Sequence, residues 1–149
     1  MLNKKVVQYL ASVGGVGYCP KASGTAGSLV AVIIFAFMAT TTIAITTLLL
    51  LWVGLVICKA SQEVFKKHDP KEFVLDEVVG MGLALIAIPL NWKYWIAAFV
   101  LFRFFDILKP LGIRKLDEWG HPHAIMWDDV LAGIYANLVL RALMHWTAF

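Results

Sequence analysis

The sequence has little cysteine, little charge and no concentrated basic stretch, and each shortage excludes a class of protein. Two cysteines, Cys19 and Cys58, are too few for a disulfide framework, and no CxxC or Cys/His spacing typical of a zinc site occurs. Charged residues make up only 15% of the chain, and the lysines and arginines are not gathered into a stripe interleaved with aromatic residues. We therefore expect no nucleic-acid partner.

Charge is absent altogether from residues 22–58, and hydrophobic residues make up 60% of the sequence. A helix needs roughly 20 apolar residues to span a bilayer, so this stretch is too long for one comfortable span and allows two short ones. The composition predicts an integral membrane protein, and the length of 149 residues predicts a single domain over residues 1–149.

Apolar runs separated by turn residues predict an all-α fold. An amphipathic N-terminal helix, with Val6, Val7 and Leu10 on one face, is expected to lie in the membrane interface. The longer runs cover residues 29–38, 43–58 with a charged helical extension to 67, 73–89, 94–108 and about 127–146. We therefore predict an integral membrane helical bundle of about five short membrane-embedded helices plus the interfacial helix.

Five spans that cross alternately would place all ten acidic residues on one side of the membrane. The lysines and arginines would lie there too, except for Lys93 and Arg141. The positive-inside rule then predicts that this charged face is cytoplasmic.

The carboxylates recur beside small residues. Asp76 and Gly80 are four residues apart and share a helix face, and Asp129 and Gly133 repeat the arrangement. Small residues allow two helix backbones to approach closely, which would bring Asp76 and Asp129 within reach of one ion. Oxygen ligands suit Mg²⁺, and the candidate ligands are Asp76, Glu77, Asp128 and Asp129. The alternative is that some of these acids are helix N-terminal residues stabilised by the helix dipole.

A basic and acidic series, Arg103, Asp106 and Lys109, follows at steps of three residues. Arg103 or Lys109 could hold a phosphate while Asp106 orients a base or reaches the metal. The alternative is a structural row of ion pairs with snorkelling cations.

The segment Gly24-Thr25-Ala26-Gly27-Ser28 lies where a loop is expected to enter a helix. Backbone N–H groups at such a helix N-terminus can bind an anion, which makes Thr25, Gly27 and Ser28 candidate phosphate-binding residues. The alternative is a Ser/Thr cap with glycines for tight packing. The segment is not a P-loop, because no GxxxxGK[ST] motif occurs.

Four ordered blocks resemble the phosphatidylglycerophosphatase A family, from about Gly14 to Val139. They are Ser-Gly-Thr-Ala-Gly-Ser (23–28), Asp-Glu-Val-Val-Gly-Met (76–81), Phe-Arg-Phe-Phe-Asp-Ile-Leu-Lys-Pro (102–110) and Met-Trp-Asp-Asp-Val-Leu-Ala-Gly (126–133). Two departures are that Ser23 stands where the family usually has proline, and that His-Pro-His stands at 121–123 where small residues are commoner.

The resemblance implies a bacterial membrane enzyme that uses Mg²⁺ to dephosphorylate phosphatidylglycerophosphate to phosphatidylglycerol and phosphate. It adds Arg114 to the candidate substrate-binding residues, and the expected catalytic acids are Asp76, Asp106 and Asp129. The expected location is the bacterial cytoplasmic membrane, with a multi-pass chain and the active site facing the cytoplasm.

Three other functions are alternatives to this hypothesis. An ion- or proton-coupled transporter would also hold membrane carboxylates, but it predicts them near the bilayer midplane. A CDP-alcohol phosphatidyltransferase is disfavoured because its DxxDG…AR…GxxxDxxxD motif is absent. A non-enzymatic membrane scaffold would leave the clustered acids unexplained.

Overall fold

The computed structural model describes residues 3–147, and all regular structure in this part of the chain is helical. Its elements are α1 (Lys4–Ala11), the short 3₁₀ helix η1 (Val16–Tyr18), α2 (Ser23–Phe35), α3 (Thr40–Phe65), α4 (Leu75–Leu85), α5 (Trp92–Leu108), α6 (Ile113–Asp117) and α7 (Ala124–Thr147). The predicted all-α fold is confirmed, and residues 22–58 form parts of two helices separated by a turn, as expected.

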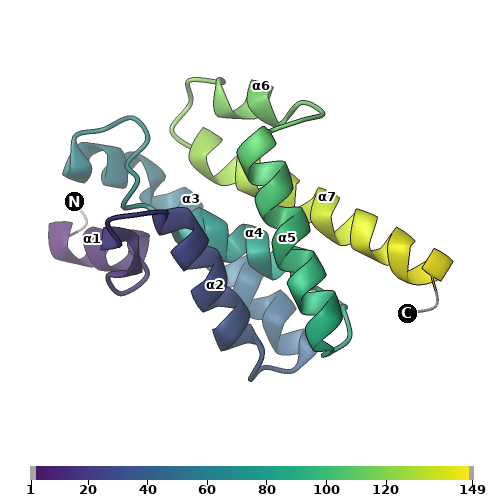
Figure 1. Ribbon diagram of the computed structural model, residues 1–149. Helices are drawn as coiled ribbons and strands as arrows, with labels where there is room; N and C mark the ends of the chain where they lie inside the picture. The colour runs from purple at the N-terminus through teal and green to yellow at the C-terminus, as the bar shows by residue number, and fades with distance from the viewer. Residues whose placement is uncertain (1–2, 148–149) are drawn as a thin grey trace.

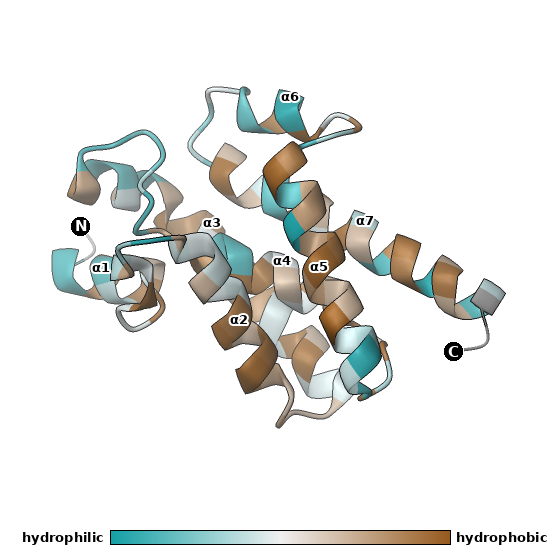
Figure 2. Cartoon of the chain, in the orientation of Figure 1, coloured by the Kyte–Doolittle hydropathy of each residue, from teal (hydrophilic) through white to brown (hydrophobic). Residues whose placement is uncertain are grey.

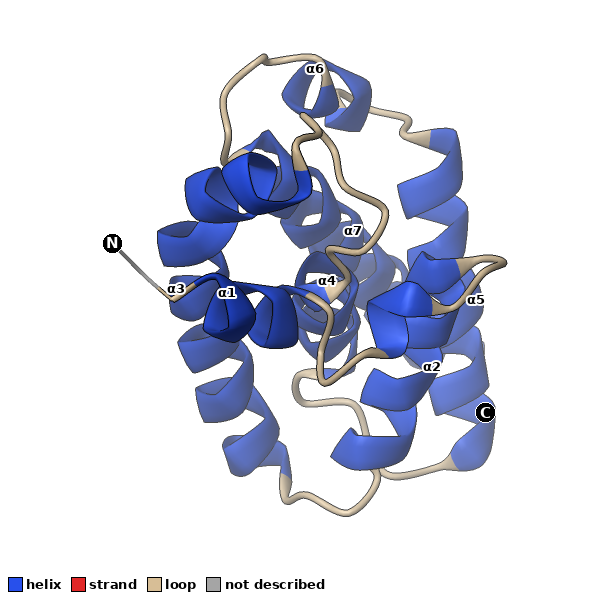
Figure 3. Ribbon diagram, turned by 90° about the vertical axis from the view of Figure 1, so that its left-hand side faces the viewer, coloured by secondary structure: helices blue, strands red, loops and turns tan. Residues whose placement is uncertain are grey.

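Helix α4 is the centre of the bundle. It contacts α2, α3, α5 and α7, and these helices surround it in the views of Figures 1 and 3. Every residue of α4 except Glu77 and Leu83 is buried. A helix that is apolar on nearly all sides is stable only when neighbours cover it, and this explains why α4 is enclosed.

Helices α4 and α7 cross closely at Gly80 and Gly133. A Cβ atom on Gly133 would overlap the carbonyl oxygen of Gly80, and one on Gly80 would lie 2.8 Å from the carbonyl oxygen of Asp129. The close approach predicted from the two glycines is therefore confirmed, and the crossing lies one helical turn below Asp76 and Asp129.

Several helix boundaries differ from the prediction, and α2 covers 23–35 where the predicted apolar run covers 29–38. Helix α4 covers 75–85 rather than 73–89, and α7 begins at Ala124 rather than near Trp127. The early end of α4 coincides with a left-handed residue, Ala87, which is followed closely by Pro89.

Polar side chains of α7 cover the C-terminal end of α4. The side-chain amide of Asn137 donates to the carbonyl oxygens of Ala84 and Ile86 at 3.0 and 2.9 Å, and the Arg141 guanidinium donates to Ile86 at 3.1 Å. The carbonyls that the helix end leaves without intrahelical partners are thereby bonded.

The N-terminal helix α1 packs on α3 through a face that differs from the expected one. Val7 and Ala11 are buried, whereas Val6 and Leu10 are exposed. The carbonyl oxygen of Ala11 also accepts a hydrogen bond from the backbone N–H of Val74, 2.9 Å away, which joins α1 to the segment before α4.

Among the described residues, α3 is the one helix that is long and apolar enough to cross a membrane by length and composition. Figure 2 shows hydrophobic residues along the middle of the bundle and hydrophilic ones gathered around α6 and the loop after α3. Many large apolar side chains lie on the outside, including Phe37, Trp52 and Ile107, which are 87%, 65% and 65% exposed. An apolar exterior of this kind favours contact with a membrane.

Candidate active site

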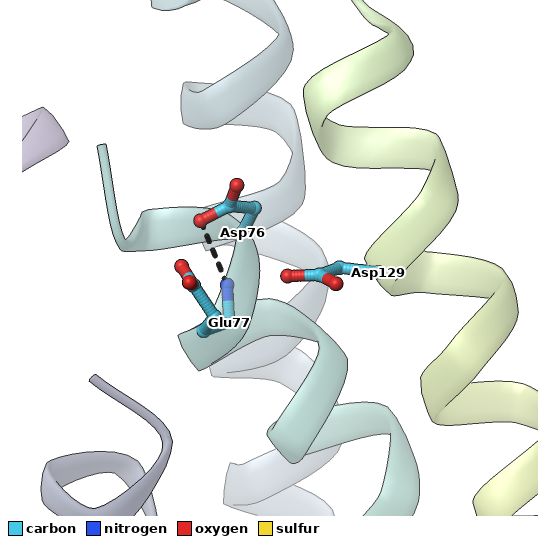
Figure 4. Close-up of side chains that lie close together, drawn as sticks. All are labelled: Asp76, Glu77 and Asp129. Atoms are coloured by element: carbon cyan, nitrogen blue, oxygen red, sulfur yellow. Dashed lines mark hydrogen bonds between the residues drawn. The ribbon is translucent and has the colours of Figure 1, made fainter. Parts of the chain in front are cut away.

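Three carboxylates meet where α4 faces α7. Asp76 and Glu77 lie in the first turn of α4, and Asp129 extends toward them from α7 (Figure 4). One oxygen atom from each of the three lies within 4.8 Å of the others. The backbone N–H of Glu77 donates to the Asp76 carboxylate at 2.9 Å and fixes its orientation. The expectation that Asp76 and Asp129 come within reach of one ion is met geometrically.

Within residues 3–147, no cationic side chain forms a salt bridge with Asp76, Glu77 or Asp129, although Arg103 lies near enough to attract Glu77. Asp76 and Asp129 are only 7% and 4% exposed. One carboxylate oxygen of Glu77, Oε2, is buried and has no hydrogen-bond partner among residues 3–147. Like charges buried together repel strongly unless a cation or protons neutralise them.

The donor set fits a hard divalent cation. The three residues offer only oxygen ligands, which Mg²⁺ and Ca²⁺ prefer. The alternative, stabilisation by the helix dipole, applies to Asp76 and Glu77 and contributes about 0.3–1 kcal/mol each. It does not explain Asp129, which lies beyond the first turn of α7.

A cavity of about 210 Å³ opens beside the three carboxylates. Its other polar walls come from several elements and from the loop after α3; they are Ser23, His68, Asp69, Lys71, Asp106, Lys109, Asp117 and Asp128. Carboxylates outnumber the ammonium groups in this lining. An anionic group can therefore enter favourably only together with cations.

Asp106 and Arg103 form one side of the site. The Arg103 guanidinium lies 2.6 Å from the Asp106 carboxylate and 3.5 Å from the hydroxyl of Ser28. Its Nε atom is buried without a hydrogen-bond partner in the described part of the chain. Asp106 lines the cavity, whereas Arg103 does not and instead forms an ion pair with Asp106.

Lys109 does not continue the row that the spacing predicts. It lies at the C-terminal cap of α5 in a left-handed conformation, with φ of 48°. Its ammonium group lies 2.7 Å from both Asp117 of α6 and Asp128 of α7. Burial disfavours its charge, but these two hydrogen bonds favour it more, and the pKa of Lys109 is raised above its ordinary value. Lys109 thus joins three helices.

Asp128 has a different environment from its neighbour Asp129. One carboxylate oxygen accepts from Lys109, and the other accepts from the backbone N–H of Asp129 at 3.0 Å. Asp128 lines the cavity but stands outside the group of Asp76, Glu77 and Asp129. The two adjacent acids of α7 therefore have different contacts.

The glycine-containing segment begins α2 as predicted, but its glycines face protein groups. A Cβ on Gly24 would overlap the Glu77 carboxylate and lie 3.3 Å from Arg103, and Gly27 packs against Val74. The Ser28 hydroxyl donates to the carbonyl of Gly24 at 2.9 Å, and Thr25 is half-buried. Ser23, at the start of α2, lines the cavity where Thr25, Gly27 and Ser28 do not.

Two further differences concern residues of α6 and of the loop after α3. Arg114 is exposed on α6 and does not line the cavity. Asp69, Lys71 and Asp117 line it although sequence reasoning did not select them, because nothing in their local pattern distinguishes them from surface charges. The roles of all these residues in binding and catalysis stay predictions.

Comparisons with known proteins agree with one another. Residues 9–144 match the family described as PgpA, Phosphatidylglycerophosphatase A. The chain is 41% identical to Phosphatidylglycerophosphatase A of Haemophilus influenzae, with 93% of this chain and 89% of the relative covered. It is 34% identical to the protein of that name from Escherichia coli, with 92% and 83% covered.

A third relative carries a different name. A protein of Bacteroides thetaiotaomicron, named as a candidate phosphatidylinositol-3-phosphatase, is 41% identical, with 89% of each chain covered. No solved structure shows a significant match. From its match over nearly the whole length, the chain belongs to the phosphatidylglycerophosphatase A family of phosphatase enzymes.

Proposed function

We propose that this protein catalyses the Mg²⁺-dependent hydrolysis of the phosphomonoester of phosphatidylglycerophosphate, which yields phosphatidylglycerol and inorganic phosphate. The observation that carries the proposal is the meeting of Asp76, Glu77 and Asp129 beside a polar cavity in an otherwise apolar bundle. Membership in the family supplies the lipid substrate class.

Asp76, Glu77 and Asp129 would hold the Mg²⁺ ion. When bound, the ion neutralises and polarises the phosphate. The unpartnered oxygen of Glu77 supports this assignment, because a ligand position would satisfy it.

Other residues of the chain bind and orient the substrate. Lys71 lines the cavity, and its ammonium group can donate to phosphate oxygens. Ser23 also lines the cavity, but its hydroxyl donates to the carbonyl oxygen of Lys71 at 2.8 Å and would have to leave that bond to donate to a phosphate. Asp106, held by Arg103, lies on the Asp129 side of the site and can orient the attacking group. That group is either water or one of the carboxylates, through an aspartyl-phosphate.

The cavity would then lie at the cytoplasmic boundary of the bacterial inner membrane, in a multi-pass bundle of α2, α3, α4, α5 and α7. Support comes from the charges along α5, which begins beside Lys93 and ends at Asp106 and Lys109. Arg141 also lies at the far end, where it bonds Ile86. A phospholipid could then keep its acyl chains in the bilayer while its phosphate reaches the acids. The transporter alternative is not favoured, because the relatives are named as phosphatases.

The test is phosphate release by the purified protein from phosphatidylglycerophosphate, with Mg²⁺ or with EDTA. Phosphatidic acid and phosphatidylinositol-3-phosphate serve as competing substrates, the second because of the Bacteroides relative's name. We expect Mg²⁺-dependent release that is fastest with phosphatidylglycerophosphate. Faster release from phosphatidylinositol-3-phosphate would move the substrate assignment to that lipid, and release unaffected by EDTA would refute the metal assignment.

A further inference from the structure

A wholly apolar groove of about 430 Å³ runs between α2 and α5. Leu29, Val32 and Ala36 form its α2 wall. The α5 wall includes Trp92, Ile96 and Phe99. No polar surface contributes to the lining, and Leu29, Trp92 and Ile96 are at least half exposed. The groove is therefore open at the side of the bundle and suits a flexible hydrocarbon.

The groove continues the helix face that carries the polar site. On α5, Trp92, Ile96, Phe99, Arg103 and Asp106 follow at steps of four, three, four and three residues, which keeps them on one face of the helix. The face spans about 21 Å, at 1.5 Å per residue. The N-terminal part of this face lines the groove, and its C-terminal part reaches the cavity through Asp106.

On α2, as on α5, polar surface near the acidic cavity is followed by apolar surface in the groove. Helices α2 and α5 pack side by side, and their contact at the upper end is the bond between Ser28 and Arg103. From there the α2 wall descends through Leu29 to Ala36. A molecule with a phosphate at one end and a hydrocarbon chain at the other matches this order of polar and apolar surfaces.

We propose that the α2–α5 groove binds one acyl chain of the phospholipid whose phosphate lies in the acidic cavity. The inference rests on the proposed function and adds to it the path of the lipid tail. A second apolar cavity, between α1, α2 and α3, is a weaker candidate. Its α4 residues are Leu75 and Val78, and its lining includes the polar groups of Tyr9 and Thr46.

The test is photolabelling of the purified full chain in phosphatidylcholine nanodiscs. The probe is phosphatidylglycerophosphate with a diazirine near the end of one acyl chain, and labelled peptides are identified by mass spectrometry. We expect label within residues 29–36 and 92–99, reduced about tenfold by a tenfold excess of unlabelled phosphatidylglycerophosphate and unchanged by added phosphatidylcholine. Label on the exposed α3 residues Leu48 and Trp52 reports bulk lipid and should not respond to either competitor.

A pair of variants tests the groove itself. Val32→Trp fills the groove and should lower the competed labelling several-fold. The control Ile33→Trp places the same side chain at the neighbouring position, which is 53% exposed and outside the groove. Competition in the unmodified protein keeps the test valid if Val32→Trp fails to fold.

Two results would overturn the assignment of an acyl chain to the α2–α5 groove. The first is labelling of α2 and α5 that is no more sensitive to the competitor than labelling of α3. The second is competed labelling around Tyr9 and Leu50, in the other apolar cavity. Phosphate release measured on the same samples separates the two proposals. Release without competed labelling removes only the groove, and competed labelling without release removes only the hydrolytic function.

Discussion

At its N-terminal end, α4 places Asp76 and Glu77 against Asp129 of α7, whereas at its C-terminal end it meets Asn137 and Arg141 of the same helix. The two contacts are both polar and both lie in an apolar bundle, but only the second is satisfied. Hydrogen bonds connect donor and acceptor at the C-terminal end, while three like charges face one another at the other. Buried polar groups with complete partners stabilise a fold, whereas unsatisfied ones mark a place where a ligand is expected.

The largest expected effect comes from removing one charge at the acidic end. Asp129→Asn and, separately, Asp76→Asn should lower Mg²⁺-dependent phosphate release by at least about 10²-fold, because each removes a charge that holds the cation. The same variants should raise the Tm in EDTA by about 2–4 °C, since relief of repulsion worth roughly 1 kcal/mol gives that shift in a chain of this size. Phosphate assays and thermal unfolding check both results. Near-normal turnover in both variants would contradict the site.

The second largest effect is expected from removal of the metal, which should affect only the acidic N-terminal end of α4. At a Mg²⁺ concentration of 100 times its Kd, binding stabilises the folded protein by about 2.7 kcal/mol, and EDTA removes this contribution. Thermal unfolding with and without EDTA measures it. Asn137→Leu should keep the full Mg²⁺ effect while Asp129→Asn loses it. Equal Mg²⁺ effects in the two variants would mean that the ion binds elsewhere.

The glycine crossing between the two ends should give a smaller effect on stability. Gly133→Ala places a methyl group on the carbonyl of Gly80, so the helices must separate, at a cost of about 1–3 kcal/mol. Urea or thermal unfolding measures the loss. Gly120→Ala does not serve as a control, because the left-handed φ of 71° at Gly120 makes alanine strained there. Ala142→Gly, at an exposed position of α7, measures instead the cost of exchanging alanine and glycine in this helix without a close helix contact. A Gly133→Ala protein as stable as the unmodified one would show that the crossing is not tight.

The smallest effect on stability is expected at the C-terminal end of α4, where hydrogen bonds connect the polar groups. Asn137→Leu removes the donor to Ala84, one of the two donors to Ile86 and the side-chain oxygen that accepts from Arg141. It should destabilise the protein by about 1–2 kcal/mol. Activity per folded molecule should stay close to normal. Leu138→Ala, at the neighbouring exposed position, is the matched control. If Asn137→Leu lost as much activity as Asp129→Asn, the two ends of α4 would not differ in their importance for catalysis.

The acidic end was predictable because its signal is local and repeated. Asp76 with Gly80 and Asp129 with Gly133 give both the carboxylates and the reason for close approach, and periodicity places them on facing helices. The helical class and most helix positions followed from the lengths of apolar runs and the turn residues between them.

Other features depended on contacts between distant segments. Lys109 reads as a member of a regular row, yet a left-handed cap turns it toward Asp117 and Asp128. The C-terminal end of α4 depends on Asn137, more than fifty residues from Ala84 in the sequence. Single-sequence periodicity reports which residues share a face of one helix, and it does not report which side chains of another helix complete that face.

The most direct test of the three-carboxylate site is the binding of Mn²⁺, in place of Mg²⁺, to the purified protein, followed by electron paramagnetic resonance. We expect saturable, Mg²⁺-competed Mn²⁺ binding to the unmodified protein and to Asn137→Leu, and loss of this binding in Asp129→Asn. Undiminished Mn²⁺ binding to a folded Asp129→Asn protein would contradict the assignment of Asp76, Glu77 and Asp129 as the cation site.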